Sequence, residues 1–259
     1  MDWNKEFYFA EEHPLDRLVD GYSNISIFRK MAVIGDSLAS GEFEVHHPNS
    51  SPEFFDVFDY SWGQFIARKN GIHVYNFSRG GMTAKEYITS FADKNNLWDR
   101  EKACQAYIIA LGVNDLYHTD IEMGSLQDID DNDYRNNKVT YCGYYAQIIS
   151  RYKEISPHAK FFLVTIPDDI RRDYNKQQRQ CGLLYDLARH FENSYVIDLY
   201  KYGPKYDEKF QHEFFLNGHL NPMGYILSAR LIDSYIDYIV RHNPMDFLYT
   251  GLINFNKNA

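Results

Sequence analysis

The 259-residue chain lacks long apolar runs, and this absence limits where the protein can reside. No stretch approaches the roughly 18 consecutive apolar residues that a membrane-spanning helix needs. The N-terminal segment MDWNKEFYFAEEHPLDR is acidic and amphipathic, and it has no basic region followed by an apolar region, the pattern of a secretory signal peptide. We therefore expect a cytoplasmic protein without a membrane span.

Cysteine and positive charge are also scarce. The three cysteines (Cys104, Cys142 and Cys181) are far apart and contain no C-x-x-C pair, so we expect free, buried thiols instead of a disulfide framework or a zinc site. The 27 Lys and Arg against 36 Asp and Glu give a formal charge of −9, which argues against a nucleic-acid partner. Phosphate-binding and dinucleotide-binding fingerprints are missing, and we expect neither a cofactor nor a metal.

Apolar and aromatic residues, by contrast, are plentiful at 44% and 17% of the chain, enough for a sizeable core. Five short runs are continuously apolar and rich in β-branched or aromatic residues, a pattern typical of strands buried on both faces. These runs cover residues 31–35, 72–77, 106–111, 160–166 and 194–199.

Segments with apolar residues at helical spacing alternate with these runs. We expect helices around residues 84–91, 141–155, 181–191 and 222–242. The last one begins at Asn221-Pro222, a capping residue followed by proline at the first helical position, and its Arg230, Asp233, Asp237 and Arg241 are predicted to face outward. The alternation predicts a three-layer α/β/α domain with a mainly parallel five-stranded sheet over residues 31–243. Residues 1–30 are predicted to be an extension packed on this domain, and residues 244–259 a C-terminal tail.

Polar residues and glycines follow the predicted strands. Ligands of open parallel sheets bind at the carboxyl ends of the strands. Ser37 follows the first run in Gly35-Asp36-Ser37, Gly81 follows the second, and Asn114 follows the third in Gly112-Val113-Asn114-Asp115. His219 stands just ahead of the last helix. We therefore expect a hydroxyl, a glycine loop, a carboxamide and an imidazole on one rim of the sheet.

Acyl transfer at neutral pH needs these groups. A serine hydroxyl is a weak nucleophile until an imidazole takes its proton, which suits Ser37 and His219. The oxyanion of the intermediate needs fixed donors, and the Gly81 N–H and the Asn114 amide can supply them. We expect Gly81 to be glycine because the lack of a Cβ lets its backbone approach a ligand closely. Thr83 with Glu86 predicts a capping box at the helix that follows.

These four blocks, in this order, resemble the SGNH (GDSL-type) esterase and lipase family over about residues 31 to 240. The resemblance implies a flavodoxin-like fold and metal-independent hydrolysis of esters, from acyl lipids to acetylated sugars. By the same resemblance Ser37 is the nucleophile and His219 the base, while the oxyanion hole is formed by Ser37, Gly81 and Asn114. Asp36 and Asp115 are expected to anchor turns through side-chain to backbone hydrogen bonds.

One position departs from the family pattern. The family usually has an aspartate three residues before the histidine, where it orients the imidazole, but Leu216 stands there in this chain. Three alternatives remain: a backbone carbonyl orients His219, another carboxylate such as Glu213 or Asp207 reaches it, or the protein works with a Ser–His dyad. We favour the carbonyl or the dyad.

The leading functional hypothesis is a serine esterase that hydrolyses a small acyl ester, with acetylated carbohydrate among the targets considered. Leu216 motivates a rival, a ligand-binding or scaffold protein that kept the fold and lost turnover. An acyltransferase that uses the same serine is a third hypothesis. The oligomeric state is left open.

Overall fold

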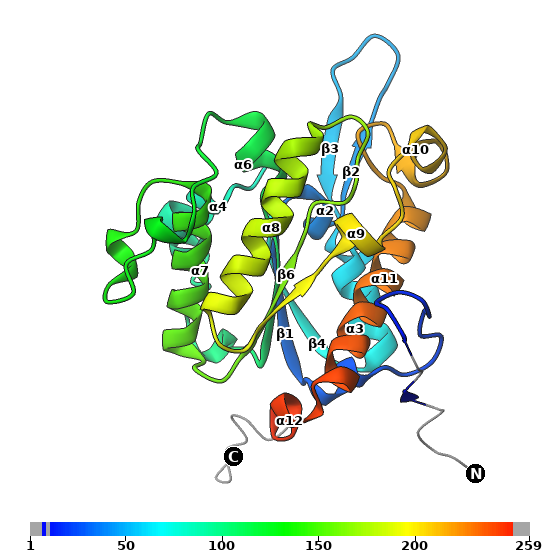
Figure 1. Ribbon diagram of the computed structural model, residues 1–259. Helices are drawn as coiled ribbons and strands as arrows, with labels where there is room; N and C mark the ends of the chain where they lie inside the picture. The colour runs from blue at the N-terminus through cyan, green and yellow to red at the C-terminus, as the bar shows by residue number, and fades with distance from the viewer. Residues whose placement is uncertain (1–6, 9–10, 251–259) are drawn as a thin grey trace, which may run out of the picture.

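The computed structural model describes residues 7–8 and 11–250, and its centre is a five-stranded, fully parallel sheet (Figure 1). The strand order is β4-β1-β5-β6-β7. The bounds are β1 (Lys30–Gly35), β4 (His73–Ser78), β5 (Ala106–Ala110), β6 (Lys160–Val164) and β7 (Ser194–Ile197). The predicted sheet is confirmed, and each strand ends within two residues of its predicted limits.

Helices cover both faces of the sheet, as the continuous apolar strands require. Within β1, Ala32 and Ile34 belong to the core cluster that contains α4, α7 and α8, whereas Met31 and Val33 belong to the one that contains α3 and α11. These helices are α3 (Trp62–Asn70), α4 (Ala84–Glu86), α7 (Tyr141–Ile155), α8 (Tyr174–His190) and α11 (Pro222–His242). The three-layer, flavodoxin-like α/β/α fold is therefore confirmed.

The predicted helices are present with small differences. The one expected at 84–91 continues from α4 through a π-helical turn, η3 (Tyr87–Phe91), into α5 (Ala92–Lys94), and α8 begins seven residues before the predicted 181. Asn221 caps α11 as expected, because its Oδ1 accepts from the Gly224 N–H at 2.9 Å. Shorter helices are α2 (Ser37–Ser40), α6 (Val113–His118), α9 (Leu199–Tyr202), α10 (Glu208–Phe214) and α12 (Pro244–Phe247).

Two small hairpins, which the sequence did not predict, lie at the carboxyl end of the sheet. The first consists of β2 (Glu42–Val45) and β3 (Glu53–Asp56), and it projects beyond the sheet at the top of Figure 1. The second consists of β8 (Phe215–Leu216) and β9 (His219–Leu220), immediately before α11. Both hairpins contribute side chains to the site described below.

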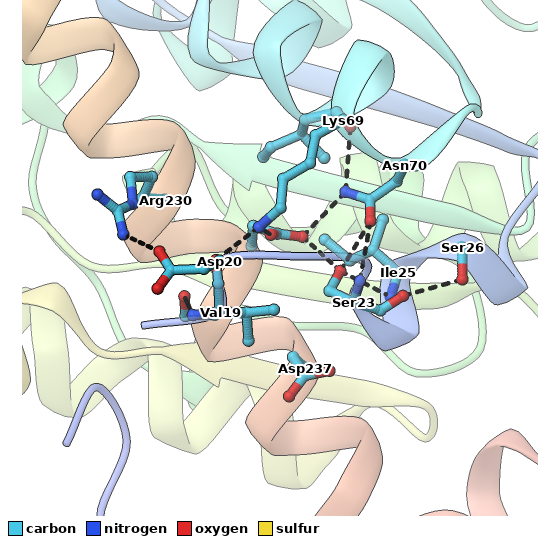
Figure 2. A network of polar contacts seen from close by, with 12 residues as sticks. Val19, Asp20, Ser23, Ile25, Ser26, Lys69, Asn70, Arg230 and Asp237 are labelled. Atoms are coloured by element: carbon cyan, nitrogen blue, oxygen red, sulfur yellow. Dashed lines mark hydrogen bonds and ion pairs between the residues drawn. The ribbon is translucent and has the colours of Figure 1, made fainter. Parts of the chain in front are cut away.

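The prediction that Asp233 and Asp237 of α11 face outward is wrong. Both are buried, at 0% and 4% exposure, because the segment that precedes β1 lies over this side of the helix (Figure 2). Ser23 Oγ donates to Asp233 Oδ1 at 2.6 Å, and the Asn24 N–H donates to Asp237 Oδ1 at 2.9 Å. Arg241 is buried as well, in contact with Asp237 at 2.8 Å, whereas Arg230 is exposed as predicted. Helical periodicity could not reveal a polar cover that comes from another part of the chain.

The two ends of the chain are only partly within the described residues. Residues 1–6, 9–10 and 251–259 lie outside them, so the predicted extension and tail can be followed only in part. Glu12 contacts Arg241 of α11 through two hydrogen bonds of 2.7 and 2.9 Å. Phe247 of α12 packs edge-on against Phe28, with ring centroids 6.3 Å apart. These contacts join both described ends to the α11 side of the sheet.

The three cysteines are buried and free, as predicted. Within the described ranges, no helix combines the length and the apolar character needed to cross a bilayer.

Candidate active site

Ser37 is the first residue of α2, directly beyond the end of β1. Asp36 caps this helix, because its Oδ1 accepts from the Leu38 N–H at 3.2 Å, and the predicted structural role of Asp36 is thereby confirmed. Burial raises the pKa of Asp36 to about 6, although the Leu38 N–H and the nearby charge of Arg172 lower it. As the first helical residue, Ser37 has a backbone N–H without a partner in the helix.

The glycine pair Gly80-Gly81 follows β4, and Gly81 lines the same cavity as Ser37. Gly81 has a φ of +70°, a left-handed conformation that favours glycine, and a Cβ built on it meets no atom within 4 Å. The expected close approach of a ligand to Gly81 stays a prediction, whereas Gly80 is the glycine that lies close to another side chain of the protein. A Cβ on Gly80 would lie 1.9 Å from Glu42 Oε2.

Half of the predicted capping box forms after this loop. Thr83 Oγ1 accepts from the Glu86 N–H at 3.0 Å. The Glu86 carboxylate does not return to the backbone but pairs with Arg79 at 2.9 Å. The cap nevertheless fixes the start of α4 directly after the glycine loop.

Asn114 lies at the start of α6, after β5, and is tied to the same loop. Its Nδ2 donates to the Met82 carbonyl at 3.1 Å, which uses one of the two amide hydrogens and leaves the other available. The neighbouring Asp115 accepts from the Ala84 N–H at 3.0 Å, as the anchoring role predicted. Burial raises the pKa of Asp115 to about 6, although hydrogen bonds from backbone N–H groups lower it.

His219, in β9, lies between two carboxylates of β2. Its Nε2 is 3.0 Å from Glu42 Oε1, and its Nδ1 is 3.0 Å from Glu44 Oε2. The interpretation that favoured a backbone carbonyl or a dyad is therefore wrong about the group that meets Nδ1. The alternative of another carboxylate is the one that the structure shows, but the residue is Glu44 and neither of the two named examples: Asp207 caps α10, and Glu213 Oε1 lies 4.0 Å from Lys209 Nζ.

The two glutamates differ in their electrostatics. Burial raises the pKa of Glu44, but hydrogen bonds from His46, His219 and the Gly218 N–H outweigh it and hold this pKa below its usual range. Burial also raises the pKa of Glu42, and there the charge of His219 does not outweigh it. The environment therefore favours the charged form of Glu44 and disfavours that of Glu42.

Ser37, Gly81, Asn114 and His219 all line one cavity of about 270 Å³ at the carboxyl end of the sheet. The structure thus brings together the four residues that the sequence selected. Within the described part of the chain no hydrogen bond joins the Ser37 hydroxyl to His219, and Nε2 is instead in contact with Glu42. The described residues also contain no group of three or more His, Cys, Asp or Glu that could hold a metal ion.

Another wall of the cavity is basic. Arg171 and Arg172, from the loop between β6 and α8, share the buried carboxylate of Asp169 at 2.7 and 3.4 Å. One carboxylate thus faces two guanidinium groups, so this wall keeps a positive charge. His118 also lines the cavity.

The comparisons with known proteins agree with this geometry. The family model for the GDSL-like Lipase/Acylhydrolase family matches residues 33–227. The chain belongs to this family. Membership supports an ester hydrolase with a small-molecule substrate, whereas the sequence has no significant match among curated proteins.

Solved structures share the fold with this family member at low sequence identity. A family two carbohydrate esterase from Clostridium thermocellum in complex with cellohexaose superposes with a TM-score of 0.59 and 14% identity, over 89% of this chain and 67% of its own. An acetyl xylan esterase superposes with a TM-score of 0.51 and 17% identity, over 78% of this chain and 97% of its own. A protein from Lactobacillus plantarum superposes with a TM-score of 0.58 and 15% identity, over 82% of this chain and 97% of its own. At these identities the likeness establishes the fold.

The contacts of Glu42 and Glu44 with His219 were not found from the sequence. A signal was present, since Glu42-Phe43-Glu44 directly follows the turn after the Ser37 helix, and alternate residues of a strand face the same side. The pairing with His219 spans 175 residues, however, and neither hairpin was predicted. The carboxylate in contact with Nδ1 comes from β2 and not from position 216.

Proposed function

We propose that this protein is a serine ester hydrolase in which Ser37 is the nucleophile and His219 the general base. The observation that carries the proposal is the shared cavity: Ser37, Gly81, Asn114 and His219, from four separate segments, line it together. These are the four functional groups that acyl transfer through a serine requires.

In the proposed reaction, Ser37 Oγ attacks the ester carbonyl carbon while its proton passes to His219 Nε2. The oxyanion accepts hydrogen bonds from the N–H groups of Ser37 and Gly81 and from the free amide hydrogen of Asn114. The bond to the alcohol oxygen then breaks, and the alcohol leaves with the proton from Nε2. Water attacks the acyl-enzyme, again giving a proton to Nε2, and the acid departs as Ser37 regains its hydrogen.

This sequence requires that Nε2 exchange its contact with Glu42 for one with the Ser37 hydroxyl. Burial disfavours the charged form of Glu42 and raises its pKa, which works against a fixed ion pair between Glu42 and His219. The cavity of about 270 Å³ suits a small acyl group. The carbohydrate esterases with the same fold support an acetylated sugar as the ester.

The test uses the full-length protein, a fluorophosphonate probe and p-nitrophenyl acetate. We expect labelling and hydrolysis in the wild type, and loss of both in Ser37→Ala and His219→Ala. Ser90→Ala and His212→Gln, away from the cavity, are the matched controls and should retain both. A folded protein that neither labels nor hydrolyses any short-chain ester would refute the proposal and favour a ligand-binding role.

Acyl transfer to an acceptor other than water is distinguished by product analysis. The hydrolase releases free acid as its main product when a sugar or alcohol is added at high concentration. Predominant formation of the acceptor's ester would instead identify an acyltransferase that uses the same Ser37. The location, cytoplasmic in our prediction, is tested by cell fractionation.

A further inference from the structure

We propose that Glu44, on the hairpin strand β2, is the positioning residue that orients His219, in the role the family motif gives to residue 216. This inference rests on the proposed function, because orientation of His219 affects turnover only if His219 is the base. It gives the β2–β3 hairpin a role in the site, although this hairpin is not among the four sequence blocks that predicted the site.

The contacts of Glu44 fix both the carboxylate and the imidazole. Oε2 accepts from His219 Nδ1 at 3.0 Å and from the Gly218 N–H at 2.9 Å, while Oε1 is 2.6 Å from His46 Nε2. Asn217 Nδ2 also donates to the Glu44 carbonyl at 2.9 Å. Both the backbone and the side chain of Glu44 therefore hold the turn that carries His219.

The position of Leu216 agrees with this assignment. Leu216 pairs directly with His219 in the β8–β9 hairpin, but its side chain is apolar and 43% exposed. It offers no acceptor to Nδ1. The hairpin strand β2 reaches the same imidazole from outside the β8–β9 hairpin and provides the acceptor instead.

Glu42 is the other carboxylate on the ring, and its geometry excludes it from this role. It contacts Nε2, the nitrogen that has to receive the Ser37 proton, so a carboxylate fixed there would compete with the nucleophile. Its contact with His219 is an ion pair, whereas Glu44 accepts hydrogen bonds from His219 and from the Gly218 N–H. Glu44 is held by three donors, and these hydrogen bonds keep its pKa below the usual range.

A fixed acceptor at Nδ1 has two consequences for catalysis. It keeps the hydrogen of the neutral ring on Nδ1, so that the lone pair of Nε2 is free to take the Ser37 proton. Its negative charge then stabilises the imidazolium that forms. A neutral glutamine of the same shape keeps the packing but removes this charge, so the substitution Glu44→Gln isolates the effect.

The experiment compares wild type, Glu44→Gln and the control Glu213→Gln in p-nitrophenyl acetate hydrolysis. We expect Glu44→Gln to lower kcat about 100-fold or more with KM within about threefold, because the orienting charge acts in the transition state. The acid limb of its kcat/KM profile should move to lower pH, since the carboxylate that stabilises the imidazolium is gone. Glu213→Gln should stay within about twofold of wild type.

A second measurement is made on the wild type and does not depend on how well Glu44→Gln folds. The proton NMR spectrum of the wild type should contain a strongly deshielded Nδ1 proton that is absent from His219→Ala. A missing signal, or a Glu44→Gln variant that keeps more than a third of the wild-type kcat, would overturn the assignment. A wild type that shows the signal but is inert towards esters and unlabelled at Ser37 would refute the proposed function and, with it, the catalytic role of Glu44.

Discussion

The substitution Asp233→Asn tests whether the buried polar network of α11 stabilises the fold. Asp233 is fully buried, and its Oδ1 accepts from Ser23 Oγ at 2.6 Å and from Asn70 Nδ2 at 3.0 Å. Its Oδ2 is 2.5 Å from Lys69 Nζ. The carboxylate thus connects the segment before β1, helix α3 and helix α11; Lys69, Asn70 and Ser23 are labelled in Figure 2. Asparagine keeps the shape but removes the charge opposite Lys69.

The expected cost follows from the burial of the pair. Removing one partner of a buried ion pair typically costs about 3–5 kcal/mol, because the other charge stays uncompensated. The Lys69 side chain is 25% exposed and can recover part of its hydration, so we expect the lower end, about 3 kcal/mol. For a chain of this size, roughly 2–4 °C per kcal/mol predicts a fall in Tm of about 6–12 °C.

The assay is urea unfolding followed by circular dichroism, with calorimetry for Tm. Arg230→Gln is the matched control, because it breaks the Arg230–Asp20 pair of the same region, whose side chains are 45% and 86% exposed. An exposed pair contributes at most about 1 kcal/mol, so this variant should remain close to wild type. If Asp233→Asn unfolds within about 1 kcal/mol of wild type, the reasoning about the buried charge is refuted.

Three further predictions concern the site. Gly81→Ala should lower the free energy of unfolding in urea by about 1–2 kcal/mol, because alanine is strained in the left-handed conformation while its methyl group meets open space. A decrease of more than about 4 kcal/mol would show that the methyl group clashes and would contradict this reasoning. The pKa of Asp36 is raised from 3.8 to about 6, so its contribution to stability is present below pH 3.8 and is lost as the pH rises through 6. The free energy of unfolding of the wild type relative to Asp36→Asn should fall by up to about 3 kcal/mol between pH 4 and 7, and a constant difference would contradict this. Leu216→Asp added to Glu44→Gln should restore kcat at least about tenfold, since directly paired residues have Cβ atoms about 4.5–5.5 Å apart; no recovery would show that residue 216 does not reach Nδ1.

Much of the fold could be predicted because its signals are local. A strand buried on both faces, such as β5, has a continuous apolar sequence, and a capped helix such as α11 begins with Asn221-Pro222. The short β2 and β8 strands have no such signal, because two to four half-exposed residues do not form a periodic pattern. Their pairing is set by the turns and by contacts with distant parts of the chain.

The candidate site also has a part that could be predicted from the sequence and a part that could not. Ser37, Gly81 and Asn114 follow strands that were predicted, so the parallel sheet alone places them at one edge. The acceptor at Nδ1 of His219 could not be predicted, because Glu44 precedes it by 175 residues and belongs to a strand outside the central sheet.

By itself, the amino-acid sequence determined the layers, the order of strands and helices along the chain, and the four groups that meet at the carboxyl end of the sheet. Burial of a strand on both faces and capping of a helix leave patterns among residues close in sequence, so these features could be deduced from the sequence. Tertiary structure alone decided that Asp233 is buried under the segment before β1 and that Glu44 contacts His219. Such contacts depend on how separate segments pack, because a carboxylate can be stabilised by any donor that the fold brings within reach.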